Sequence, residues 1–129
     1  MDLDKNRRMQ QENVDRGRYQ VSVVDQLSNR PVENARVKIS YTGDPDSVIE
    51  ELVTNSSGRT PVIELKTPPL EYSMEPVEQQ PYAEYTVQID AEGFESEEVA
   101  GSEVLPQVLS SQPVMLAARS VSEEYQRIV

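Results

Sequence analysis

The feature that most constrains the fold is a series of short segments in which apolar and polar residues alternate. The clearest runs from 82 to 91, where Tyr85, Val87, Ile89 and Ala91 alternate with polar residues. A period of two places apolar side chains on one face of a half-buried β-strand. Shorter or less regular versions occur at 19–25, 35–41, 48–54, 60–65, 94–99 and 112–116. Seven short strands at fairly even spacing predict an all-β domain, either a sandwich or a barrel.

The segments between these strands contain the residues that chain reversals need. Asn29 and Pro31 follow the first strand, and Gly43 lies in a loop after the second. The segment 55–58 reads as a tight turn, in which Gly58 is free to take a positive φ. The longest connection, 66–81, is rich in proline, and we expect it to lie against the sandwich through Leu70, Tyr72 and Met74.

The length of 129 residues fits one domain, which we place at 18–118. Residues 1–17 are polar and charged, and we expect a flexible leader there. Residues 119–129 are expected to form a flexible tail, a linker or a short helix with Ser122 as its N-cap. The sequence contains no internal repeat.

The chain contains neither cysteine nor histidine. Disulfides, thiol nucleophiles, imidazole acid–base chemistry and nearly all zinc sites are therefore excluded. Its serines have no neighbouring base to activate them, so we expect no enzyme, no cofactor and no metal centre. No apolar stretch approaches the roughly 20 residues that cross a bilayer, and the start lacks the apolar core of a secretory signal. The expected location is cytoplasmic or spore-associated.

The charge is strongly negative and uneven. The formal net charge is −11, and the segment 40–118 holds fifteen acidic residues against only Arg59 and Lys66. Such a body repels nucleic acid and anionic membranes, so neither is expected as a partner. The charges keep the domain soluble, or form an acidic face for a basic protein partner.

Two stretches carry a family resemblance. Tyr19-Gln-Val-Ser-Val-Val-Asp, followed by Arg30-Pro-Val-Glu-Asn-Ala-Arg-Val-Lys-Ile, resembles the opening of carboxypeptidase regulatory-like, or prealbumin-like, domains. Thr54-Asn-Ser-Ser-Gly and Tyr85-Thr-Val-Gln-Ile-Asp-Ala-Glu-Gly-Phe94 approximate two later motifs of that family. The resemblance covers about 19–116 and implies a seven-stranded prealbumin-like (Ig-like) β-sandwich, but it says little about function.

A narrower resemblance bears on function. The segment from Val48 to Leu65, then Pro68-Pro-Leu-Glu-Tyr-Ser-Met-Glu and Pro81-Tyr-Ala-Glu-Tyr, is similar to the N-terminal domain of clostridial spore cortex-lytic enzyme precursors. In that family the domain precedes a peptidoglycan-lytic part, which this sequence does not contain. The resemblance implies a pro-domain or accessory role in spore germination, either as part of a larger chain or as a free-standing relative.

Three chemical alternatives are weaker. A prealbumin-like fold also hosts a hydrolase of purine breakdown products, but that activity needs histidines and a C-terminal Tyr-Arg-Gly-Ser that are absent here. Related pilin domains form Lys–Asn isopeptide bonds, but Lys38 lies on the polar face of its strand and no Asn follows Asn55. Asp44 and Asp46, with Asp25 or Asp90, supply oxygen ligands for calcium without the spacing of a calcium loop.

The resulting hypothesis is a non-catalytic accessory or pro-domain module that acts on a lytic enzyme by protein–protein packing. The alternative is a generic structural or surface interaction module without a regulatory role. The sequence leaves the oligomeric state open, because sandwich edge strands either pair or are blunted. Tyrosine is favoured at interfaces, and the proposed contact residues are Pro68, Pro69, Leu70, Tyr72, Met74, Pro81 and Tyr82.

Overall fold

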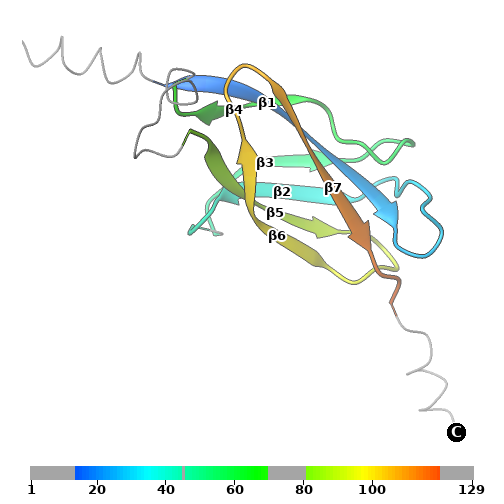
Figure 1. Ribbon diagram of the computed structural model, residues 1–129. Coiled ribbons are helices and arrows are strands. Elements are labelled where there is room, and N and C mark those ends of the chain that lie inside the picture. Colours follow the sequence, from blue (N-terminus) through cyan, green and yellow to red (C-terminus); the bar gives the residue numbers. More distant parts are fainter. Residues whose placement is uncertain (1–13, 45, 70–80, 120–129) are drawn as a thin grey trace, which may run out of the picture.

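The protein is described by a computed structural model covering residues 14–44, 46–69 and 81–119. Within these residues the chain is all β (Figure 1), with seven strands and no helix. The sequence prediction of a seven-stranded sandwich is therefore confirmed. The strands are β1 (Asp15–Asp25), β2 (Arg36–Tyr41), β3 (Val48–Val53), β4 (Ile63–Thr67), β5 (Ala83–Asp90), β6 (Glu97–Val104) and β7 (Leu109–Leu116).

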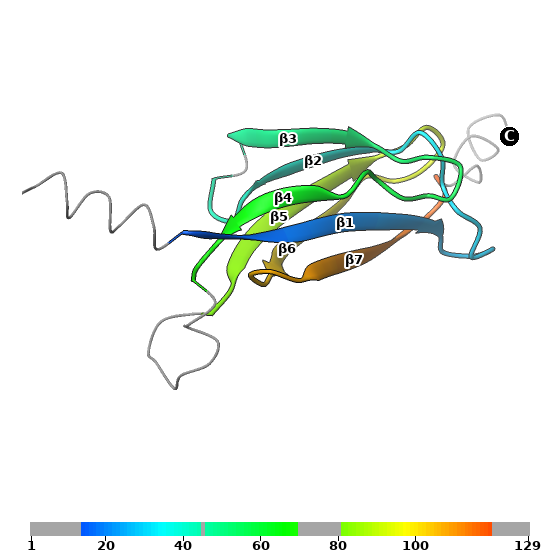
Figure 2. The same ribbon diagram turned by 90° about the horizontal axis from the view of Figure 1, so that it is seen from above.

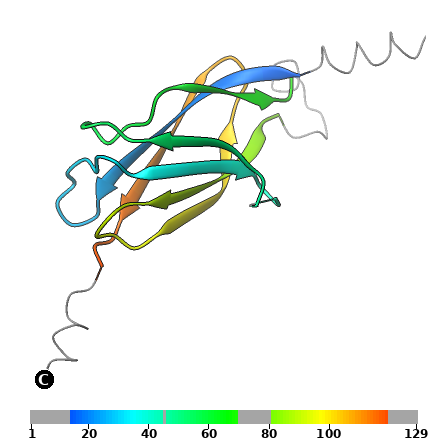
Figure 3. The same cartoon turned by 180° about the vertical axis from the view of Figure 1, so that it is seen from behind.

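The strands form two stacked sheets (Figure 2). One has three strands in the order β4-β1-β7, and the other has four in the order β3-β2-β5-β6. β1 and β7 run parallel, while every other pairing is antiparallel. β6 and β7 contact each other on one side of the sandwich. On the other side, the edge strands are β3 and β4, and Figure 3 shows β3 and β2 on the near sheet.

The core consists of the inward side chains of both sheets, as the period-two pattern predicts. β1 contributes Tyr19, Val21 and Val23, and each is fully buried. Each fully buried aliphatic side chain of this kind stabilises the fold by about 1.5–3 kcal/mol relative to the exposed state. The whole cluster comprises Tyr19, Val21, Val23, Val32, Ala35, Val37, Ile39, Leu65, Tyr85, Val87, Ile89, Val104, Val114 and Leu116.

The start of β1 differs from the sequence prediction. The strand begins at Asp15, inside the segment that was assigned to the leader, and Asp15–Tyr19 pair with β4. The alternation of apolar and polar residues is not visible in the sequence there, because the inward position is occupied by Gly17, which has no side chain. A Cβ on Gly17 would lie 2.1 Å from the carbonyl oxygen of Leu105, so the close approach of the two backbones requires glycine.

β6 also differs from the prediction, which placed a strand at 94–99 and a linker from Gly101. The strand runs from Glu97 to Val104, and Phe94 instead forms an isolated bridge with Ala118. The register with β5 shifts between Tyr85 and Val87, so β6 holds one extra residue. This bulge includes Gly101 at a φ of 71°, and it breaks the alternation that sequence patterns detect.

Two further predictions concern the ends of elements. β7 begins at Leu109 rather than at the predicted Gln112. Its first three residues pair with β1, but apolar and polar residues alternate poorly there, so the sequence pattern did not include them in the strand. β4 is shifted toward Ile63–Thr67 relative to the predicted 60–65. The helix start predicted at Ser122 lies outside the described residues.

Candidate interaction surface

A small cavity lies on the side of the sandwich where β3 and β4 form the two sheet edges. Its volume is about 130 Å³, and all strands except β6 and β7 contribute to its lining. We call the lining residues the open side: Arg16, Tyr41, Ile49, Glu50, Glu64, Leu65, Lys66 and Tyr85.

Two tyrosines form the floor and rim of the open side. The rings of Tyr41 and Tyr85 are tilted by 30° with centroids 5.3 Å apart, a separation typical of favourable aromatic pairs. Tyr85 is buried, and its hydroxyl donates to the carbonyl oxygen of Lys66 at 2.6 Å. Burial, together with the neighbouring Tyr41, raises the pKa of Tyr85 to about 12, against the opposing effects of this hydrogen bond and Arg16. Tyr85 therefore ties β5 to β4 as a neutral side chain.

Apolar side chains are exposed around this rim. Tyr41, Val48 and Ile49 keep between 38% and 43% of their surface exposed. Ile49 is the extra residue of a bulge, since Ile39 pairs with Glu50 and Ser40 with Val48. The bulge directs Ile49 into the lining of the cavity, whereas a regular strand would leave it on the outer face. The start of β3, together with Tyr41 at the end of β2, thus presents apolar side chains to solvent beside the cavity.

The contact residues predicted from the sequence lie partly next to the open side. Pro68 and Pro69 follow β4, and Pro81 and Tyr82 precede β5, so all four lie at the end of the sandwich that also holds Lys66 and the hydroxyl of Tyr85. Pro69 is buried, while Pro68, Pro81 and Tyr82 are half-buried. The remaining three predicted residues, Leu70, Tyr72 and Met74, lie outside the described residues.

Sequence reasoning missed the residues of the β3 edge. The alternating pattern correctly assigned Tyr41 to the same face as Val37 and Ile39, but it did not show that Tyr41 is exposed there. No pattern distinguished an edge strand from a central one. The signal that was available is the run Val48-Ile-Glu-Glu-Leu-Val, which has four apolar residues but no strict alternation. Loss of alternation is typical of a bulge.

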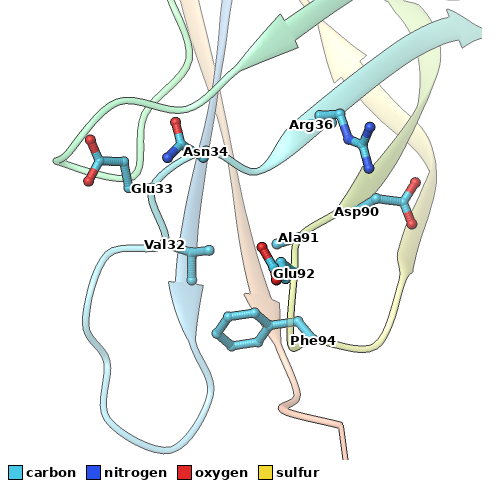
Figure 4. A pocket seen from close by; sticks show the side chains of 8 residues that line it. All are labelled: Val32, Glu33, Asn34, Arg36, Asp90, Ala91, Glu92 and Phe94. Carbon is cyan, nitrogen blue, oxygen red and sulfur yellow. The ribbon is translucent and has the colours of Figure 1, made fainter.

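A larger hollow lies at the opposite end of the sandwich (Figure 4). Its volume is about 440 Å³, and it lies between the segment that leads into β2 and the turn that follows β5. Its lining combines three acidic side chains and one guanidinium with the apolar side chains of Val32 and Phe94. The lining has no hydroxyl, amine or imidazole that could act as a nucleophile. The lining residues are Val32, Glu33, Asn34, Arg36, Asp90, Ala91, Glu92 and Phe94.

The calcium alternative is wrong on geometry. Asp25 and Asp90 end β1 and β5, whereas Asp44 and Asp46 follow β2, which runs antiparallel to β5. The two pairs therefore lie at opposite ends of the sandwich. In the part of the chain that the structure describes, no three acidic side chains are grouped so that they could hold a metal ion. None of the described segments is a helix long and apolar enough to cross a bilayer.

Comparison with known proteins identifies a shared fold. No family model and no curated protein match the chain. Among solved structures, GBS52, the minor pilin of Streptococcus agalactiae, superposes with a TM-score of 0.53 at 12% identity, over 83% of this chain and 46% of the pilin. The Klebsiella pneumoniae 5-hydroxyisourate hydrolase gives a TM-score of 0.50 at 16% identity, over 80% of this chain and 92% of the hydrolase.

The Bacillus anthracis TIE protein also has a TM-score of 0.50 at 12% identity, and the match covers 81% of this chain but only 17% of that protein. The chain thus spans a small part of the TIE protein and less than half of the pilin. At these identities the likeness concerns the fold alone. The chain is a prealbumin-like β-sandwich, as its sequence resemblance implied.

Proposed function

We propose that this prealbumin-like sandwich is a non-catalytic accessory or pro-domain module that binds a peptidoglycan-lytic partner through its open side. The observation that carries the proposal is the exposed apolar rim formed by Tyr41, Val48 and Ile49 beside a cavity between the sheets. Exposed aromatic and aliphatic side chains next to a depression are typical of protein-binding hot spots.

The choice of a lytic partner rests on sequence. The segments that resemble the N-terminal domain of spore cortex-lytic enzyme precursors include Val48–Leu65 and both ends of the proline-rich connection. These segments contribute β3, β4 and the start of β5, which border the open side. The match to 17% and 46% of two longer chains also agrees with the use of such a sandwich as one module of a larger assembly.

The test measures binding of the chain to the cortex-lytic enzyme of the organism that makes it, by titration calorimetry, together with the rate of cortex lysis. The double variant Tyr41→Ser, Ile49→Ser removes the apolar rim at two exposed positions. Truncating two hot-spot side chains costs about 2 kcal/mol or more, so we expect binding to weaken at least roughly tenfold.

The matched control is Leu27→Ser. Leu27 is 90% exposed beyond the end of β1, away from the open side, so the control removes a comparable apolar group elsewhere. A lytic enzyme that binds the double variant and the wild type equally would contradict the proposal. Replacing 70–80 by a short polar linker tests the predicted contact residues in the same assay, and unchanged binding would remove them from the interface.

The alternative is a structural or surface module without regulatory role. Under that alternative the wild-type domain neither binds the lytic enzyme nor changes the rate of cortex lysis. The mass of the native polypeptide adds an independent result: a precursor much larger than 14.6 kDa that is later trimmed to this size supports the pro-domain role.

A further inference from the structure

The four sheet edges of this sandwich are unequally protected. β7 carries Pro113 in its middle, and the carbonyl of that proline accepts a hydrogen bond from the Gln112 side chain. β4 is only five residues long and is bracketed by Pro61 and Pro68. Prolines, short length and bulges are the usual means of preventing an edge from pairing with another chain.

β6 is protected by charge and shape. Its bulge at Gly101 interrupts the ladder, and Glu97, Glu98 and Glu103 are all exposed along it. β3 remains as the edge with the least protection. It contains no proline, and its bulge at Ile49 lies near the start of the strand. The stretch from Glu50 to Val53 pairs regularly with β2.

The free edge of β3 has backbone groups directed away from the molecule. The N–H of Thr54 donates to the carbonyl of Ala35 at 3.0 Å, so the backbone of Thr54 faces the β2 side. Successive residues of a strand alternate in this direction, so the N–H and C=O of Glu51 and Val53 point outward. No described strand lies on that side.

The outer face of the four-stranded sheet specifies which side chains an added strand needs. One cross-strand row reads Glu98, Gln88, Lys38 and Glu51, and the next reads Asp90, Arg36 and Val53. Opposite charges in neighbouring positions stabilise a sheet, and like charges destabilise it. An added strand would therefore need a cationic side chain next to Glu51 in the first row and an apolar side chain next to Val53 in the second row.

The charged side chains of β3 and of the loop before it are all acidic, while the cations Lys38 and Arg36 lie on the neighbouring β2. The stretch from Asp44 to Val53 holds four acidic residues and no basic one. A second copy of this chain fits less well, because the antiparallel register that aligns the outward backbone groups pairs Glu51 with Val53 of the copy. That register places the two Glu51 side chains diagonally across the pair and supplies no cation for either. The field at this edge selects a positively charged strand.

We propose that β3 accepts an extended, cationic segment of the partner as a fifth, antiparallel strand of the four-stranded sheet. The segment has the order apolar, apolar, cationic, cationic, opposite Val53, Leu52, Glu51 and Glu50 respectively. Backbone hydrogen bonds supply affinity, and alternate side chains supply specificity, as in other cases of strand addition. This mode of binding rests on the proposed function, since β3 borders the open side and Glu50 lines its cavity.

The first test uses a capped synthetic peptide with the central sequence Val-Val-Lys-Lys-Val, observed by the amide shifts of the isotopically labelled full chain. We expect shifts centred on Glu51 and Val53, with binding that weakens as salt is added because the contact is electrostatic. A peptide with glutamates in place of the lysines should not bind. A peptide with proline in place of the first valine, whose N–H would face the carbonyl of Val53, should not bind either, because proline has no N–H to donate.

Charge reversal at the edge provides the matched pair of variants. Glu51→Lys and Glu98→Lys change the net charge equally, and both residues are exposed in the same cross-strand row at opposite edges. Replacing one attractive pair by a repulsive one should weaken peptide binding roughly tenfold for Glu51→Lys. Glu98→Lys should leave it close to that of the wild type.

Three results would overturn this inference: shifts confined to β6 or β7, equal affinity of the two charge-reversed variants, or a β3-mediated dimer seen by sedimentation in place of peptide binding. The peptide assay contains no lytic enzyme, so its failure is distinct from failure of the proposed function. If the enzyme binds through the Tyr41 and Ile49 rim but the peptide does not bind β3, only the strand-addition mode is wrong.

Discussion

At the residue scale, the buried polar groups form short, fully used hydrogen-bond chains. The Tyr19 hydroxyl lies 2.6 Å from Ser102 Oγ, and Ser102 in turn donates to the Gln112 side chain at 2.7 Å. Because the serine proton is used on Gln112, Tyr19 is the donor to Ser102. This chain links β1, β6 and β7 through the interior, and no buried side-chain polar atom among the described residues lacks a partner.

We predict that alkaline pH destabilises the fold through Tyr19 and Tyr85. Burial raises the pKa of each to about 12, from an ordinary value of 10.0. Between these values the unfolded chain loses the phenolic proton first, so the free energy of unfolding falls as pH rises from about 10 to about 12. The loss is on the order of 2 kcal/mol for each tyrosine. Urea titrations across this range measure it.

Tyr19→Phe serves as the matched variant. It should cost about 1 kcal/mol at neutral pH, the value of one hydrogen bond, because Ser102 keeps its bond to Gln112. In this variant, the decrease in the free energy of unfolding at alkaline pH should be about half of that in the wild type. An alkaline fall equal to that of the wild type would show that Tyr19 does not contribute to it.

Thr54 leads to a second prediction at this scale. Its buried Oγ1 accepts the N–H of Ala35 at 2.9 Å and donates to the carbonyl of Val32 at 2.7 Å. Thr54→Val keeps the shape but leaves both backbone groups unsatisfied, which should lower the free energy of unfolding by about 3 kcal/mol. Thr54→Ser retains both bonds and should cost about 1 kcal/mol. Equal losses in thermal or urea unfolding would contradict this assignment.

At the scale of elements, the turn between β3 and β4 is organised by Asn55 and Gly58. Asn55 Oδ1 accepts the N–H groups of Ser57 and Arg59, and the carbonyl of Gly58 accepts the N–H of Val23 in β1 at 2.7 Å. Gly58 has a φ of 73°, and a Cβ there would lie 2.4 Å from the carbonyl oxygen of Val23. The turn can therefore pack against β1 only if position 58 is glycine.

We predict that Gly58→Ala is far more destabilising than Gly93→Ala. Gly93 has a similar φ of 84°, but a Cβ there would meet no atom within 4 Å. Gly93→Ala thus costs only the conformational strain of about 1–2 kcal/mol, while Gly58→Ala adds a clash with backbone. The difference between the two variants in the free energy of unfolding, measured with urea, gives the steric contribution. Similar losses would show that the turn moves away from β1 at no cost in stability.

Elements differed in how well their sequence predicted them. β5 was predicted closely, because its alternation is unbroken and its inward residues are all apolar. The start of β1 and the second half of β6 were missed for the same reason: a glycine occupies a position where the pattern needs an apolar side chain, at Gly17 and Gly101. A glycine that permits close approach or a bulge reads in sequence as a break.

At the scale of the whole molecule, the core formed by the described residues extends from Tyr19 to Leu116. We predict that a fragment spanning 14–119 folds with a free energy of unfolding within about 1 kcal/mol of the full chain, since truncations away from the core are usually near neutral. A fragment spanning 20–119 removes the pairing of Asp15–Tyr19 with β4 and should be much less stable. Circular dichroism with urea titration measures both, and equal stability of the two fragments would contradict the pairing.

The contact residues named from the sequence stay a prediction. Sequence composition directed attention to prolines and tyrosines around the connection 66–81, and the structure describes four of the seven named residues: Pro68, Pro69, Pro81 and Tyr82. The β3 edge and the exposure of Tyr41 were not predicted. Edge position depends on which strands lack a neighbour, and that depends on pairings between segments distant in the chain.

The sequence by itself determined the all-β class, the inward faces of most strands and the chemistry that is unavailable without cysteine or histidine, because these follow from local periodicity and residue type. Only the tertiary structure decided the strand order β3-β2-β5-β6, the parallel pairing of β1 with β7 and the edge left unpaired. Those features depend on contacts between residues far apart in the chain. Their free energy comes from shared burial, which no single segment encodes.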